Sequence, residues 1–211
     1  MRLRHLAVFG LFAIFAVDAA ASEPQAPLAF TVLRDGDKVG SNIIRFQPQP
    51  GGVNVTIDTQ ILVKIAMIPV YRFEHHGEET WRDGRLQSLT SNTNDDGKRH
   101  ALQVAAGQDQ LQIDGDGQHK LMPNDAVPAS LWNSTLVTQS SLLNTLDGSA
   151  MAVKIADLDQ DKVSVHGQEQ LAHHYAVTGD LKREVWYDAS GSLVQVRFKA
   201  EDDSKIEYVL K

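Results

Sequence analysis

Residues 71–86, YRFEHHGEETWRDGRL, gather two adjacent histidines, several charged side chains and a tryptophan into one short stretch. Histidine and glutamate are residue types used in acid–base catalysis and in zinc binding, so His75 and Glu79 are candidates for either chemistry. On a β-strand, however, residues four positions apart lie far from each other. We therefore expect a hydrolase or metalloenzyme here only if neighbouring strands bring further polar groups to this pair.

Alternation along a strand divides this stretch into two faces. One face is aromatic with His75 and Glu79 embedded in it, and a buried carboxyl group there must be either paired or protonated. The other face carries charges of alternating sign, which is typical of a solvent-exposed surface. A bulge at Gly77 would break this alternation. The first face consists of Tyr71, Phe73, His75, Glu79 and Trp81, and the second of Arg72, Glu74, His76, Glu78 and Thr80.

The rest of the chain offers no motif with a catalytic mechanism. The pairs His75-His76 and His173-His174 place one imidazole on each side of a strand, whereas zinc needs three or four convergent ligands. The chain has no cysteine, which excludes a thiol nucleophile and disulfides, and it contains no G-x-S-x-G motif. We therefore predict no catalytic residue, no metal ion and no cofactor, and we favour a binding protein over an enzyme.

The start of the chain has the three parts of a secretory signal peptide. Residues 1–5 are basic, residues 6–17 are apolar but too few for a comfortable membrane span, and the alanines at 19–21 suit cleavage after Ala21. We predict a signal peptide at 1–21 and a single domain at 22–211. The expected location is the periplasm, as a soluble protein that does not span a membrane.

The charge balance limits the partners. The chain carries 20 Lys and Arg against 27 Asp and Glu, which gives a net charge of −7 at pH 7. No cluster of basic residues interrupts this acidic balance. It therefore argues against nucleic acid as a partner and against attraction to anionic lipid surfaces by charge.

Six Asp-Gly pairs, which begin at residues 35, 83, 96, 114, 116 and 147, separate runs of alternating apolar residues. Such pairs favour hairpin turns, and the alternation predicts roughly ten to twelve half-buried strands. Short turns favour antiparallel pairing of consecutive strands, and a sheet of this size curls. The predicted fold is an all-β antiparallel meander curled into a complete or partial barrel. Residues 123–146 break the pattern and are expected to form a short helical and loop insertion that plugs one end.

Three stretches carry a resemblance to a known family: VYRFEHHGEETWRDGRLQSLTSNTNDDGKRH, PASLWN and YAVTGDLKREVWYDASGSLVQVRF. In these residues the chain resembles a family of exported bacterial proteins catalogued as domain of unknown function 6134, and the resemblance extends from Phe30 to Leu210. It implies a periplasmic, β-rich domain. It implies no activity and no catalytic residue.

Two kinds of binding function fit these observations. Curled antiparallel sheets of this size enclose cavities, so the domain is predicted to bind a lipid or another apolar small molecule. The candidate ligand-binding residues supply aromatic walls and a polar contact for a head group: Arg72, His75, Glu79, Trp81, Trp132 and Trp186. The alternative is a non-catalytic protein that docks an envelope partner through an exposed strand edge or through residues 123–146.

Overall fold

The computed structural model describes residues 26–211, and the predicted signal peptide at 1–21 lies outside the described residues. Fifteen strands and one short 3-10 helix make up the domain. The first part contains β1 (Leu28–Arg34), β2 (Asp37–Gln49), β3 (Gly52–Ile65), β4 (Ile68–Arg82), β5 (Arg85–Asp95), β6 (Lys98–Ala106), β7 (Gln110–Gly115) and β8 (Gln118–Pro123). A middle segment follows with β9 (Val127–Pro128), η1 (Ser134–Thr138) and β10 (Ser141–Leu143). The last part contains β11 (Ala150–Val165), β12 (Gln168–Gly179), β13 (Arg183–Tyr187), β14 (Leu193–Lys199) and β15 (Lys205–Leu210).

Asp-Gly pairs form four of the tight turns between consecutive strands, at residues 35, 83, 96 and 116. In each pair both residues have positive φ, 49–50° for the aspartates and 72–93° for the glycines, which matches the right-handed twist of a hairpin. The pair at 114 instead ends β7, and the turn between β11 and β12 uses His166 and Gly167. The turn between β3 and β4 is also different, because Ala66 and Met67 occupy it.

The strands form one continuous sheet in the order β8-β7-β6-β5-β4-β3-β2-β1-β15-β14-β13-β12-β11-β10-β9. All neighbours within the described residues are antiparallel except β9 and β10, which pair in parallel. The first strand of the chain pairs with the last, so β1 and β15 lie in the middle of the sheet. The two edges, β8 and β9, are consecutive in the chain but not paired. The predicted curled meander is confirmed, and it is a partial barrel.

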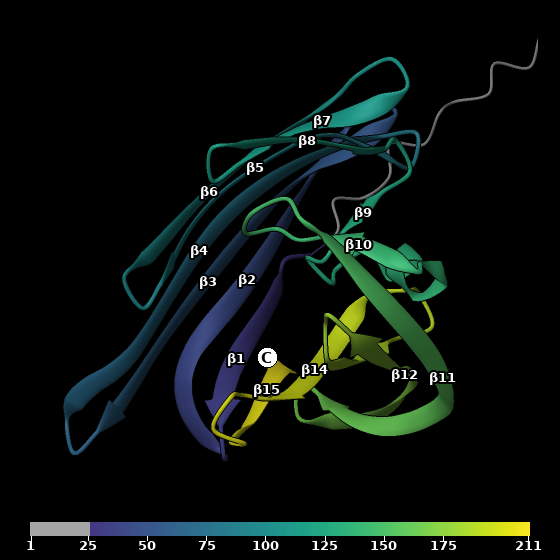
Figure 1. Cartoon of the computed structure of the whole chain (residues 1–211). Helices are drawn as coiled ribbons and strands as arrows, with labels where there is room; N and C mark the ends of the chain where they lie inside the picture. Colours follow the sequence, from purple (N-terminus) through teal and green to yellow (C-terminus); the bar gives the residue numbers. More distant parts are fainter. Residues whose placement is uncertain (1–25) are drawn as a thin grey trace, which may run out of the picture.

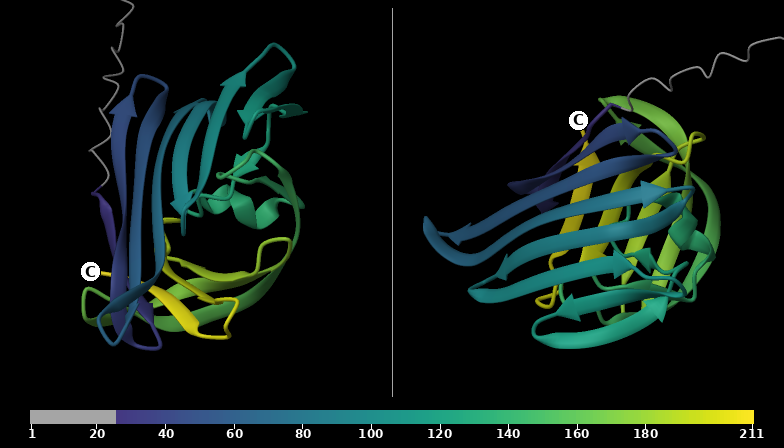
Figure 2. Two further views of the ribbon diagram at one scale, coloured as in Figure 1. Left: turned by 60° about the vertical axis from the view of Figure 1, so that its left-hand side comes forward. Right: turned by 90° about the horizontal axis from the view of Figure 1, so that it is seen from above.

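The sheet bends into two walls that face each other (Figures 1 and 2). Strands β1 to β8 form one wall, and β11 to β15 form the other. The segment with β9, η1 and β10 lies between the walls at one end. It is the insertion that the sequence predicted at 123–146, although its helical part is limited to η1. Leu136, Leu142 and Leu143 of this segment are fully buried in the core between the walls.

Most of the alternating residues face the interior as predicted, including Phe30, Val32 and Ile113. In β2 the buried residues are Asn42 and Ile44, whereas Ile43 has the opposite parity and is half-buried. The end of β3 is a second difference, because Ile65 is exposed although it continues the alternation. Within residues 26–211 no helix reaches the length and hydrophobicity that a membrane crossing requires.

Candidate functional site

A cavity of about 350 Å³ lies between the two walls. Its volume is at the small end of the range for ligand pockets, which is about 300–1,000 Å³. Its apolar lining comes from both walls and from the loops beside β9 and β10: Ile57, Phe73, Leu131, Leu146, Met151, Leu181, Val196 and Phe198. The cavity therefore has the size and the surface of a site for one small, largely apolar molecule.

Arg183, the first residue of β13, brings a cation to this cavity. Its guanidinium carbon lies 3.7 Å from the centre of the Phe198 ring, and Nη1 donates a hydrogen bond to the carbonyl of Lys182 at 2.8 Å. No carboxylate among the described residues forms an ion pair with it. Burial lowers the pKa of the guanidinium, but an arginine stays charged in water. A positive charge thus faces the cavity without an anionic partner from residues 26–211.

The phenol of Tyr208 lines the same cavity. Its ring packs edge-on against Phe198, with 6.1 Å between ring centres. Burial raises the pKa of the phenol, so the hydroxyl keeps its proton and can donate a hydrogen bond. Within residues 26–211 this hydroxyl makes no hydrogen bond. Arg183 and Tyr208 can therefore both donate hydrogen bonds to an anionic group in the cavity.

The opposite wall carries a row of polar side chains that crosses five strands in register. Asn42 is paired with Thr59, Thr59 with His75, His75 with Thr93, and Thr93 with His100. The amide of Asn42 donates to Thr59 Oγ1 at 2.7 Å, and His75 Nδ1 shares a hydrogen bond with Thr93 Oγ1 at 2.7 Å. Cross-strand pairs of this kind satisfy polar groups that would otherwise be costly to bury.

His75 lies where this row meets the cavity. Burial lowers the pKa of the imidazole to about 4, so the ring is neutral at neutral pH. Gly77 leaves space for the ring, because a Cβ there would come 3.0 Å from His75 Nε2. The strand stays regular through Gly77, and the bulge expected there lies between Thr80 and Trp81 instead.

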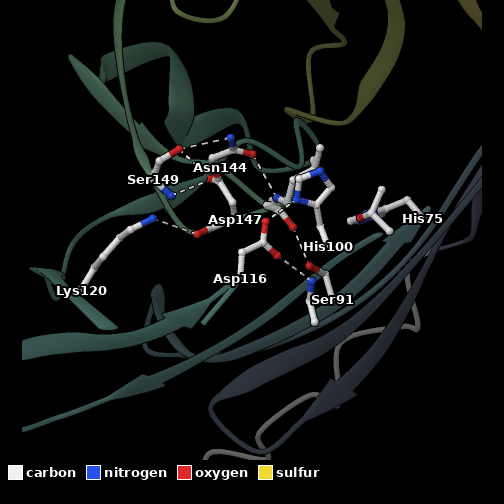
Figure 3. Close-up of polar contacts among 12 residues, drawn as sticks. His75, Ser91, His100, Asp116, Lys120, Asn144, Asp147 and Ser149 are labelled. Atoms are coloured by element: carbon white, nitrogen blue, oxygen red, sulfur yellow. Dashed lines mark hydrogen bonds and ion pairs between the residues drawn. The ribbon is translucent and has the colours of Figure 1, made fainter. Parts of the chain in front are cut away.

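A second hollow of about 600 Å³ lies over β3 to β6 and is more open and more polar. His100 ends the polar row there, and its Nδ1 contacts Asp116 Oδ2 at 2.5 Å (Figure 3). The hydrogen bond from His100 holds the pKa of Asp116 below its usual value. Beside it, Ser91 donates to the carbonyl of Thr145 at 2.5 Å, which fastens the loop after β10 to the first wall. The first contact joins β6 to the turn between β7 and β8, and the second joins β5 to the loop after β10.

Glu79 is buried at the other end of β4, with 2% of its surface exposed. Its Oε2 accepts hydrogen bonds from the indole N–H groups of Trp81 at 2.7 Å and of Trp132 at 2.9 Å. Burial raises the pKa of the carboxyl group, although Ser130 and the two indoles oppose that shift. Because Trp132 belongs to the middle segment, Glu79 anchors that segment to β4.

The structure brings Glu79, Trp81 and Trp132 together, but His75 is bonded elsewhere, to Thr93. No group of three or more His, Asp or Glu side chains in residues 26–211 converges in a way that could hold a metal ion. The arrangement around Glu79 is a buried anchor in which Oε2 accepts from both indoles and Oε1 has no hydrogen-bond partner. It exposes no reactive atom to a cavity.

The remaining candidates lie away from the cavity. Arg72 is exposed towards the far end of β4 and forms an ion pair with Glu74 at 2.6 Å. Trp186 is fully buried and lies on the opposite face of β13 from Arg183. Its ring stacks on His174 with 4.0 Å between ring centres. Neither residue lines either cavity.

Sequence reasoning missed Arg183 and Tyr208, the donors that face the cavity. The signal was present, because Arg183 has the same parity as Val185 and Tyr187, two fully or nearly fully buried residues of β13. An arginine at an inward position of a strand indicates a polar function for that face.

Comparison with known proteins supports a single assignment. No match was found among curated proteins. A family model described as Domain of unknown function (DUF6134) matches residues 30–211, which include every strand from β2 to β15 and all residues of the cavity. The chain therefore belongs to the DUF6134 family.

Proposed function

We propose that this chain is an exported, periplasmic protein that binds one small apolar molecule with an anionic group in the cavity between its two walls. The observation that carries the proposal is the pair of donors that line the cavity: among the described residues Arg183 has no anionic partner, and the Tyr208 hydroxyl makes no hydrogen bond. A carboxylate, sulfonate or phosphate would supply that acceptor. The apolar lining would take the rest of the molecule.

The electrostatics of the cavity support an anion rather than a cation. Lys182 is exposed next to Arg183 and adds a second positive charge to the same lining. The one carboxylate in the lining, Asp180, already accepts a hydrogen bond from the backbone N–H of Ala152 at 2.8 Å. His75 on the facing wall is neutral because burial lowers its pKa. The local charge is thus positive in a chain whose net charge is −7.

The location follows from the N-terminal sequence. A basic start, an apolar run and small residues at 19–21 are the features of a secretory signal peptide. A cavity for an amphiphile suits the periplasm, where apolar molecules must cross an aqueous space between two membranes. The proposed protein is therefore a carrier or sensor of such a molecule and carries out no reaction on it.

Replacing Arg183 by methionine is expected to weaken the binding of decanoate about 10- to 100-fold and to leave the binding of decanol unchanged. The reason is that a hydrogen bond to a charged group contributes about 1.5–3 kcal/mol, and about 1.4 kcal/mol corresponds to a factor of ten. Isothermal titration calorimetry of the mature protein with both compounds measures the difference. Tyr208→Phe is expected to give a smaller loss for decanoate.

The matched control is Arg85→Met, because Arg85 is exposed at the start of β5 and lines neither cavity. It is expected to bind decanoate as the wild type does. Equal affinity of the wild type for decanoate and decanol would contradict the proposed role of the anionic group. Failure of the wild type to bind either compound would contradict the proposed function itself.

A further inference from the structure

The hairpin formed by β3 and β4 projects beyond the rest of the sheet and ends in an apolar tip (Figures 1 and 2). We call residues 62–70 the hairpin tip. Its apolar side chains are unusually exposed, at 83% for Met67, 66% for Ile68 and 60% for Ile65. Leu62 and Val70 extend the apolar surface along both strands. Burying large apolar side chains is favourable, so such a tip is costly to leave in water.

The backbone of the tip shows that its apolar residues are kept at a conformational cost. Ala66 and Met67 have φ of 48° and 72°, the same pair of positive angles that Asp-Gly adopts in four other turns of this chain. Side chains with a Cβ are disfavoured in that region, and glycine is the usual choice. The tip therefore has two apolar residues where the other described turns with these angles have Asp-Gly or, between β11 and β12, His-Gly. A departure from turn chemistry without a gain in packing points to a function.

The charges around the tip match a lipid surface. The thirteen residues from Ile61 to Phe73, ILVKIAMIPVYRF, contain Lys64 and Arg72 but no acidic residue. Both cations are exposed. At the base of the tip Arg72 pairs with Glu74, and the hydroxyl of Tyr71 donates to Asp95 at 2.8 Å, so Lys64 is the cation without a carboxylate partner among the described residues. Basic residues and tyrosine at the base of an apolar segment are typical of elements that lie at a membrane interface, because their polar ends reach the head groups.

We propose that the hairpin tip inserts into the interfacial region of a phospholipid bilayer and anchors the domain there reversibly. Ile65 and Leu62 occupy opposite parities of β3, so apolar side chains project from both faces of the hairpin. A bilayer surrounds an inserted tip on all sides, whereas a folded protein partner would cover one face. Insertion of roughly 5–10 Å would submerge the apolar residues and leave Lys64 and Arg72 at the level of the head groups.

This inference does not depend on the proposed ligand, because no residue of the tip lines either cavity. It also refines the expectation drawn from the acidic composition. Apolar insertion supplies the binding, and the net charge of −7 on the whole chain opposes attraction by charge. Binding is therefore expected to vesicles of phosphatidylcholine alone as well as to vesicles that also contain phosphatidylglycerol.

The test is vesicle co-sedimentation of the mature protein and of the variant I65T/A66D/M67G/I68T. The variant gives the tip the Asp-Gly turn used elsewhere in the chain, so its melting temperature is expected to be no lower than that of the wild type. It removes the most exposed apolar side chains, so its partition into vesicles is expected to fall roughly tenfold or more. The control L121S/L171S removes two leucines that are 54% and 58% exposed on other strands and should bind as the wild type does.

Two results would overturn the proposal. One is that the wild type does not sediment with either kind of vesicle, or that the tip variant sediments equally well. The other is that the wild type forms a dimer without binding vesicles, and that the tip variant is a monomer by sedimentation velocity. That second result would assign the tip to a second copy of this chain.

Discussion

Replacing Trp186 by alanine is expected to lower the free energy of unfolding by about 3–5 kcal/mol, the largest change we predict for a single residue. The indole has no exposed surface, stacks on His174, and lies beneath the guanidinium of Arg197 at 4.9 Å from the ring centre. Alanine removes these contacts and leaves a cavity that the rigid strands on either side cannot fill. Urea denaturation followed by circular dichroism measures the loss.

Trp186→Phe is the matched comparison for this prediction. Phenylalanine keeps an aromatic ring against His174, and it removes the indole Nε1, which is buried without a hydrogen-bond partner. The expected loss is therefore less than half of that for alanine, because a costly unpaired donor disappears together with part of the packing. Equal losses for the two variants would contradict this prediction, because they would show that the retained phenyl ring recovers none of the packing that alanine removes.

Replacing Glu79 by leucine is expected to lower the free energy of unfolding by about 2–4 kcal/mol at pH 5. Leucine has a similar volume, but it accepts no hydrogen bond, so the indole N–H groups of Trp81 and Trp132 lose their common acceptor. Because Trp132 lies in the middle segment, the variant should also loosen that segment, and hydrogen exchange of residues 129–138 should become faster. Denaturation and exchange measured together test both consequences.

The pH dependence of the stability of Glu79→Gln tests whether Glu79 acts as a buried ionisable group or only fills space in the core. Burial raises the pKa of Glu79 in the folded state above the ordinary value of 4.5. The stabilisation by the protonated carboxyl group is therefore fully present below pH 4.5 and is lost as pH rises through the folded-state pKa. Glutamine cannot ionise, so its stability relative to the wild type should increase with pH above 4.5. A constant difference between pH 4 and pH 8 would contradict the raised pKa.

A double-mutant cycle completes this test. Trp132→Phe removes one of the two donors, so Glu79→Leu should cost less in that background than in the wild type. Additive losses would mean that the carboxyl group and the indole act independently, in spite of the 2.9 Å between Glu79 Oε2 and Trp132 Nε1.

Local signals in the sequence were sufficient for the architecture. Asp-Gly turns and alternating apolar residues act over a few positions, and they correctly predicted an antiparallel meander that curls into a partial barrel. The short strands β9 and β10 were missed because they contain only two and three residues and owe their pairing to the walls. Ile65 shows the limit of alternation, since the pattern continues into a hairpin end that leaves the body of the domain.

The positions of the site residues depend on contacts between strands and could not be predicted from short stretches of sequence. The pairing of His75 with Thr93 is decided by the register between β4 and β5, and a bulge between Thr80 and Trp81 shifts that register. Arg183 faces a cavity only because the second wall bends over the first. No spacing within one strand encodes that bend.

The pairing of β1 with β15 has a consequence for how the chain could be reconnected. The backbone N–H of Lys211 donates to the carbonyl of Ala29 at 3.0 Å, so the two ends of the sheet-forming chain are adjacent. A chain that began at Asn124, ended at Pro123 and joined residues 211 and 26 by a short linker would run through its strands in the order of the sheet. Such a circular permutant is expected to fold, and the seam between β1 and β15 would become one more hairpin in a sheet whose strands all follow in chain order.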